Sequence, residues 1–184
     1  MLLVSLIMLS SCTETADKQT LTTSKTMNNW LEILTEEMPL LGHRNWIVVT
    51  DMAYPLQSNP SILTLYASEP YAEVLSSVKQ LIDNSPHVFA HVYQDEEQQA
   101  MSEDLSTGWN AYRTAVDEAL GEQEVAYVLH EELINRLDEV ARLYRVVIIK
   151  TNLTIPYSST FFELDCDYWD AKRQSALLNK LIVK

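Results

Sequence analysis

A histidine and an aspartate flank a short apolar run in the segment LGHRNWIVVTDMAYP, residues 41–55. His43 precedes Ile47–Val49, and Asp51 follows it. Imidazole gains or loses a proton near neutral pH, and a carboxylate accepts hydrogen bonds or orients an imidazole. The two residue types therefore point to proton transfer by general acid–base catalysis.

The run between them is rich in β-branched residues and ends in turn signals, which predicts a buried strand. At about 3.3 Å per residue, His43 and Asp51 would lie roughly 26 Å apart at opposite ends of it. If both are catalytic, either the strand is shorter and bent or a neighbouring subunit completes the site. Each residue also has a structural interpretation: His43 as a turn histidine bonded to backbone, and Asp51 as the cap of the turn before Pro55.

Helical and strand patterns alternate along the rest of the chain. Helices are expected at 30–38, at 70–82, at 108–120 and within 122–144, and strands at 47–49, 62–66, 88–93, 145–150 and 160–164. Several of the apolar runs are continuous, as in strands that are buried on both faces. The pattern predicts one α/β domain over residues 28–184, with a sheet covered by helices on both faces.

The beginning of the chain has a different composition. Leu2–Leu9 is apolar but too short to span a bilayer, and Leu9-Ser10-Ser11-Cys12 resembles a bacterial lipobox. We expect residues 1–12 to be a lipoprotein-type signal peptide with Cys12 lipidated, and the polar residues 13–27 to be a flexible tether. The protein would then be lipid-anchored in the bacterial cell envelope, in the periplasm or at the outer membrane. Since no Lys or Arg precedes Cys12, an ordinary signal peptide or a hydrophobic terminus is the alternative.

The composition of the chain argues against several classes of partner and cofactor. The 184 residues carry a formal net charge of −13, which argues against a nucleic-acid partner. Only three glycines occur, so the Gly-rich loops of dinucleotide and triphosphate sites are absent. No metal is expected, because a zinc site built on His87 and His91 lacks a third ligand at convincing spacing. Once Cys12 is acylated, Cys166 has no cysteine left to pair with.

The remaining polar candidates have simple structural interpretations. His91 alternates with aromatic residues along a strand, which favours a buried or interfacial position. His130 is interpreted as part of a solvated helix face, and Asp95–Glu97 as a solvated cap or the start of a helix. Cys166 has no assignable histidine partner, so nucleophilic catalysis is a poor interpretation.

The pattern Gly42-His43, apolar strand, Asp51, Pro55 resembles the ribose pyranase and fucose mutarotase family. The similarity continues through the following strands and helices to about residue 170, with an inserted or rearranged segment at 103–124. Near its end, Tyr168-Trp169-Asp170 is similar to the family's Tyr-x-Asn motif.

The resemblance implies a homo-oligomeric α/β isomerase without cofactor, acting on a monosaccharide at subunit contacts. It would interconvert ring forms or anomers of the sugar. Carried over by motif, the catalytic residues are His43 as general acid/base, Asp51 and Tyr168. A site between subunits would also explain the separation of His43 from Asp51.

Four further residues are expected to bind the sugar: Asp170, Lys150, Asn152 and Tyr157. Tyr168 and Trp169 could instead be core or interface aromatics, and Asp170 an exposed charge. Two features depart from what the family shows: Asp170 stands where its motif has Asn, and the polar residues 171–175 follow where the family chain ends in an apolar strand. Two other functions therefore stay open, a non-catalytic sugar-binding protein and a structural envelope lipoprotein on the same scaffold.

Overall fold

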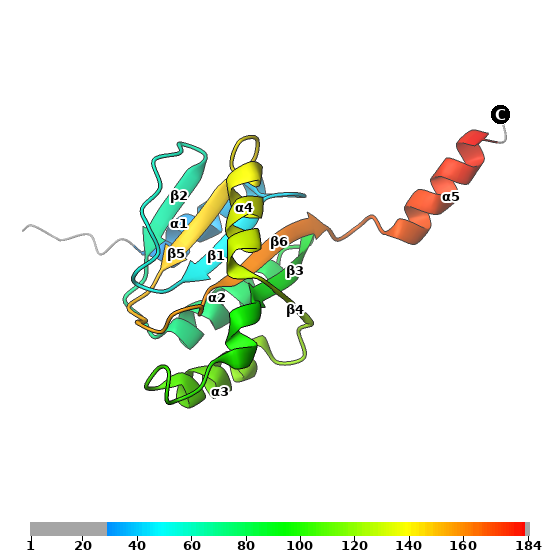
Figure 1. Cartoon of the computed structure of the whole chain (residues 1–184). Coiled ribbons are helices and arrows are strands. Elements are labelled where there is room, and N and C mark those ends of the chain that lie inside the picture. Colours follow the sequence, from blue (N-terminus) through cyan, green and yellow to red (C-terminus); the bar gives the residue numbers. More distant parts are fainter. Residues whose placement is uncertain (1–28, 183–184) are drawn as a thin grey trace, which may run out of the picture.

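The computed structural model describes residues 29–182, which form a mixed sheet with helices on both faces (Figure 1). The strands are β1 (Trp46–Thr50), β2 (Ile62–Tyr66), β3 (Val88–Asp95), β4 (Val125–Val128), β5 (Val146–Lys150) and β6 (Thr160–Cys166). The α-helices are α1 (Trp30–Glu37), α2 (Tyr71–Asp83), α3 (Trp109–Leu120), α4 (His130–Val140) and α5 (Ala171–Ile182). Short 3₁₀ turns occupy Met38–Leu40 and Glu96–Ala100.

Strand direction decides which side chains meet. The sheet order is β2-β5-β1-β6-β3-β4. β1 and β2 both pair in parallel with β5, β3 pairs in parallel with β4, and β6 runs antiparallel to β1 and β3. The carboxyl ends of β1, β3, β4 and β5 therefore share one end of the sheet with the start of β6. The opposite end gathers the beginnings of β1 and β3 and the end of β6.

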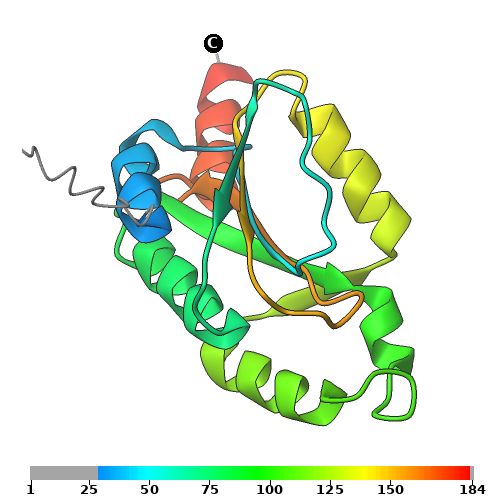
Figure 2. The ribbon, with the colours of Figure 1, turned by 90° about the vertical axis from the view of Figure 1, so that its left-hand side faces the viewer.

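One face of the sheet is covered by α1, α2 and α3 (Figure 2). Helix residues such as Leu34, Val78 and Val116 pack with strand residues such as Ile47 and Phe162, and all five side chains are at most 1% exposed. Apolar positions at helical spacing in the helices and alternating positions in the strands produce this layer.

The other face is covered by α4 alone among the described helices (Figure 2). Leu133 and Leu137 of α4 pack in one cluster with Trp46 and Phe161 of the sheet. Trp46 meets the edge of Phe161 and also stacks on Tyr93, with ring centroids 5.8 Å apart in the stacked pair. The prediction of a sheet covered on both faces is confirmed, although the second cover is one helix wide.

The predicted elements agree with the structure except in one segment. Residues 122–144 were expected to contain a helix, which α4 confirms from His130 onward, but the edge strand β4 at 125–128 was not predicted. A four-residue strand shows too few alternations to be separated from the helical pattern that follows it. The predicted signal peptide and tether, residues 1–27, lie outside the described residues. Within 29–182, no helix combines the length and apolar character needed to cross a bilayer.

Candidate functional site

A cavity of about 640 Å³ opens at the carboxyl ends of the parallel strands. Its polar lining includes Asp51 just after β1, His130 at the start of α4, and Tyr157 and Ser159 just before β6. Open α/β sheets bind ligands beyond the carboxyl ends of their strands. We refer to this space as the large cavity.

His130 is held in the large cavity by a buried carboxylate. Its Nδ1 lies 3.1 Å from Oδ1 of Asp95, the last residue of β3, and Asp95 is fully buried. The backbone N–H of His130 donates to the carboxylate of Glu97 at 3.1 Å. With Asp95 ionised, the proton of a neutral His130 is held on Nδ1. Nε2 is then the ring nitrogen able to accept or deliver a proton.

Burial raises the pKa of Asp95 to about 6, although the bond with His130 opposes this shift. The other oxygen, Oδ2, is buried and has no hydrogen-bond partner in the described part of the chain. Asp95 is therefore a desolvated carboxylate whose principal partner is a cavity histidine. Such desolvated, specifically paired groups are typical of functional sites.

Tyr157 and Asp51 also line the large cavity. The Tyr157 ring meets His130 edge-on, with centroids 5.6 Å apart, and its backbone adopts a left-handed φ of 55°. That conformation is uncommon for a bulky residue. Oδ1 of Asp51 accepts the backbone N–H groups of Ala53 at 2.6 Å and Tyr54 at 3.1 Å. Asp51 therefore stabilises the turn, as its structural interpretation expected, and also lines the cavity.

The rest of the lining is mainly apolar. Met52, Pro55, Ile134 and Ile155 are among its members, and no lysine or arginine lines it in the described structure. Such a cavity suits an uncharged molecule that has both hydroxyl groups and apolar faces. A phosphate ester would meet carboxylates without a cation to balance its charge.

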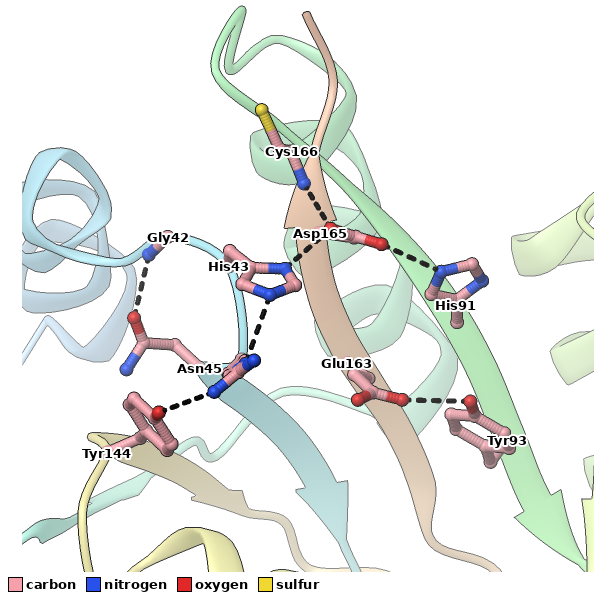
Figure 3. Close-up of polar contacts among 10 residues, drawn as sticks. Gly42, His43, Asn45, His91, Tyr93, Tyr144, Glu163, Asp165 and Cys166 are labelled. Atoms are coloured by element: carbon pink, nitrogen blue, oxygen red, sulfur yellow. Dashed lines mark hydrogen bonds and ion pairs between the residues drawn. The ribbon is translucent and has the colours of Figure 1, made fainter. Parts of the chain in front are cut away.

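A second polar site lies at the opposite end of the sheet and is shown in Figure 3. His43 Nδ1 lies 2.6 Å from Oδ1 of Asp165, and His91 Nε2 lies 3.4 Å from Oδ2 of the same carboxylate. The backbone N–H of Cys166 also donates to Oδ1 at 2.7 Å. Partial burial works against these bonds, but together they lower the pKa of Asp165. We refer to His43, His91 and Asp165 as the imidazole cluster.

The arrangement around His43 fixes its tautomer. Nε of Arg44 donates to His43 Nε2 at 3.1 Å, and the same guanidinium donates to the Tyr144 hydroxyl at 2.9 Å. Because Nε2 accepts a bond, a neutral His43 carries its proton on Nδ1 and donates it to Asp165. Arg44 reaches this position from a left-handed backbone, with φ 74°.

Beside the imidazole cluster is a smaller cavity of about 190 Å³. Tyr93 and Glu163 line it with the cluster, and the Tyr93 hydroxyl donates to Glu163 at 2.9 Å. Burial and the neighbouring Glu163 carboxylate raise the pKa of Tyr93 to about 12. Across residues 29–182, no three potential metal ligands are arranged to hold an ion.

The three predicted catalytic residues do not lie together in the structure. His43 and Asp51 lie at opposite ends of β1, so they share no cavity within one chain. Tyr168 follows β6, is 66% exposed and lines neither cavity. Of the predicted sugar-binding residues, Tyr157 does line the large cavity.

The other three predicted sugar-binding residues have structural partners and do not line the large cavity. Asp170 accepts the backbone N–H of Arg173 at 2.7 Å and caps α5. Lys150 donates to the carbonyl of Tyr54, and Asn152 accepts the hydroxyl of Tyr66.

Two interpretations made from the sequence were wrong. His130 is not simply part of a solvated helix face, and Asp95 is not solvated, because the two form the buried pair of the large cavity. The alternative that Asp95–Glu97 starts a helix is confirmed, since the 3₁₀ turn Glu96–Ala100 follows Asp95. One signal was available: Asp95 continues the every-second-residue phase of His91 and Tyr93, which points its side chain to the α4 face of the sheet. His91 was expected to be buried or interfacial, yet about half of its side chain is exposed within the chain.

Comparison with known proteins gives a family match. Residues 25–164 match the model of the RbsD / FucU transport protein family. The comparison with curated proteins found no match.

Solved structures with a similar chain include three from bacteria. One is Bacillus subtilis RbsD complexed with D-ribose, at 20% identity and TM-score 0.48, over 72% of this chain and 91% of that one. FucU from Bifidobacterium longum has 14% identity and TM-score 0.49, over 73% and 94%. The fucose mutarotase of Streptococcus pneumoniae, in complex with L-fucose, has 18% identity and TM-score 0.47, over 72% and 91%.

Proposed function

This chain belongs to the RbsD / FucU transport protein family, as its sequence pattern predicted, and from that premise we propose that it binds a monosaccharide in the large cavity and interconverts its ring forms or anomers. The observation that carries the proposal is the pairing of His130 with the buried Asp95 at the cavity wall, 3.1 Å apart. No cofactor is needed for this chemistry, since it moves only protons.

Ring opening removes a proton from the anomeric hydroxyl and delivers one to the ring oxygen, and ring closure reverses both transfers. We assign the transfers to Nε2 of His130. Asp95 is the positioning residue, because it fixes the Nδ1–H tautomer and stabilises the imidazolium that forms. One positioned acid–base group contributes typically 10² to 10⁴-fold.

The remaining lining suits recognition of a sugar. Asp51 is placed to accept a sugar hydroxyl, while its Oδ1 is held by the turn. The Tyr157 ring and the apolar side chains Met52 and Ile134 offer surfaces to the C–H faces of a pyranose. The absence of a basic side chain from the described lining favours a sugar without a phosphate group.

His43 enters the proposal only through a second copy of the chain. It lies at the far end of β1 from the large cavity and is more than half exposed, in contact with Asp165 and Arg44. A homo-oligomer that brings His43 to a neighbour's cavity would restore the catalytic role expected from the sequence. In that arrangement two histidines from two copies would serve one sugar.

Exchange NMR on D-ribose and L-fucose tests the assignment. These sugars are present in two of the similar solved structures and are the first probes to use. We expect the intact chain to accelerate exchange between ring forms, and His130→Asn to reduce that acceleration by at least 10²-fold. Glu118→Gln, a substitution on α3 away from both cavities, is the control.

The outcomes separate the alternatives. Loss of exchange in His43→Asn alone would move the chemistry to His43. Loss in both variants, with recovery when the two inactive proteins are mixed and reassembled, would indicate a cavity shared between copies. Sugar binding by calorimetry without any acceleration would leave a sugar-binding protein, and no binding of any sugar would overturn the proposal.

The location of the protein is a separate proposal. We propose that Cys12 is lipidated and anchors the chain in the cell envelope, as the lipobox-like segment predicts. Metabolic labelling with a fatty acid in a bacterial host tests it. Label should enter the intact chain and not the Cys12→Ser variant, and equal labelling or none in both would refute the anchor.

A further inference from the structure

Within residues 29–182, no other element covers helix α5. It projects from the body beyond β6 (Figure 1), and every side chain from Ala171 to Leu181 is exposed. An isolated helix of 12 residues is only marginally stable in water. A helix of this kind gains most of its stability when an apolar face packs against another surface.

The two sides of α5 differ in chemistry. At 3.6 residues per turn, Leu177, Leu178 and Leu181 fall within about 100° of one another around the helix axis. Lys172 falls on the opposite side, whereas Arg173 and Lys180 border the leucine face, within about 60° of Leu177. This is the pattern of an amphipathic helix that lies in the interface of a membrane.

Charge is segregated between α5 and the body. Residues 171–182 contain three basic side chains and no acidic one, whereas residues 29–170 contain 24 acidic and 7 basic side chains, a net charge of −17. An anionic surface would therefore attract α5 and repel the rest of the described chain. This separation would keep the body and its cavities clear of such a surface.

Exposed aromatic side chains lie immediately before α5. Tyr168 and Trp169 are 66% and 43% exposed, and the indole N–H of Trp169 donates to Gln174 of α5 at 2.8 Å. Tryptophan and tyrosine are enriched where a membrane meets water. The bond to Gln174 joins Trp169 to the first turns of the helix.

We infer that α5 binds the surface of a bilayer that contains anionic phospholipids. The three leucines enter the boundary between headgroups and acyl chains, and the basic side chains face the lipid phosphates. This inference is independent of the proposed isomerase function and of a lipid on Cys12.

The alternative partner for α5 is the acidic body of a second copy of this chain. The apolar surface of that body is less suited to receive a stripe of leucines. The most exposed leucines of the body, Leu40, Leu56, Leu105 and Leu143, lie on four separate segments of the chain, whereas those of α5 lie on one helix.

Vesicle co-sedimentation of the full chain tests the inference. All variants carry Cys12→Ser, so that acylation cannot contribute. We expect binding to vesicles of equal phosphatidylglycerol and phosphatidylcholine, and weak binding to phosphatidylcholine alone. At about five-fold per basic residue near an anionic surface, Lys172→Gln with Lys180→Gln should weaken binding by about 30-fold.

The matched control makes the same charge change on the body, with Lys79→Gln and Arg142→Gln, and should bind as tightly as the parent chain. Vesicle binding should shift the fluorescence emission of Trp169 to the blue. Leu177→Gln with Leu181→Gln should abolish both the binding and this shift. Equal binding by the parent chain and the lysine variant would overturn the inference. So would a lipid-free oligomer that the leucine variant dissociates, in a chain that does not bind vesicles.

Discussion

Asp95→Asn tests the electrostatics of the large cavity, because it keeps the side-chain shape and removes the charge. Burial raises the pKa of Asp95 from 3.8 to about 6 in the folded chain. Between these values the folded state holds a proton that the unfolded state has released. The free energy of unfolding therefore falls as pH rises through this range, and the full cost is present above pH 6.

The size of the effect follows from the pKa shift. A difference of about two pKa units corresponds to roughly 3 kcal/mol. The carboxylate is fully buried, so solvent does not reduce this value much. Asparagine does not ionise, and the free energy of unfolding of the wild type should fall by about 3 kcal/mol relative to Asp95→Asn between pH 4 and pH 7.5.

Urea unfolding of both proteins at several pH values across this range provides the measurement. The difference between the two curves should change by up to about 1.4 kcal/mol per pH unit near pH 5. Asp104→Asn, at an exposed aspartate, provides the control and should run parallel to the wild type. Parallel curves for the wild type and Asp95→Asn would show that Asp95 titrates normally, and the buried pair would lose its proposed role.

Three other substitutions test the packing and the polar contacts. Phe161→Ala should lower the free energy of unfolding by about 3–5 kcal/mol, because the ring is fully buried against Trp46. A loss under about 1 kcal/mol, measured by urea unfolding, would contradict the described core. Tyr71→Phe should cost about 1–3 kcal/mol in the same assay, because the hydroxyl donates to the buried carbonyl of Ser158 at 2.6 Å; an unchanged midpoint would argue against that bond. The contacts that lower the pKa of Asp165 stabilise the folded state at pH values above the pKa of the unfolded chain. This contribution is lost as the pH falls through the pKa of Asp165 in the folded chain. Asp165→Asn should therefore lose under about 1 kcal/mol at pH 7 and nothing near pH 2, whereas a pH-independent difference would refute the ionic contribution.

Much of the fold could be predicted because its signals are local. Continuous β-branched runs such as 146–150 form buried strands, and leucines and valines at helical spacing form the covered faces of helices. The strand β4 was missed because its four residues carry too little alternation. The sheet order could not be predicted either, because it depends on pairings between segments that lie far apart in the sequence.

The separation of His43 from Asp51 was determined by the sequence itself. A strand between two residues keeps them apart by a distance that the backbone fixes, whatever surrounds it. The structure agrees, with the two side chains at opposite ends of β1 and in different cavities. The family was also predictable, because this local pattern is part of what the family shares.

Only the tertiary structure decided which groups surround each end of β1. Asp95 and His130 are 35 residues apart, and they meet because β3 and β4 pair in parallel and α4 begins directly after β4. Asp165 reaches both His43 and His91 because β6 runs antiparallel between β1 and β3. Side-chain type and spacing describe what a residue can do, whereas strand order and direction decide which partners it meets.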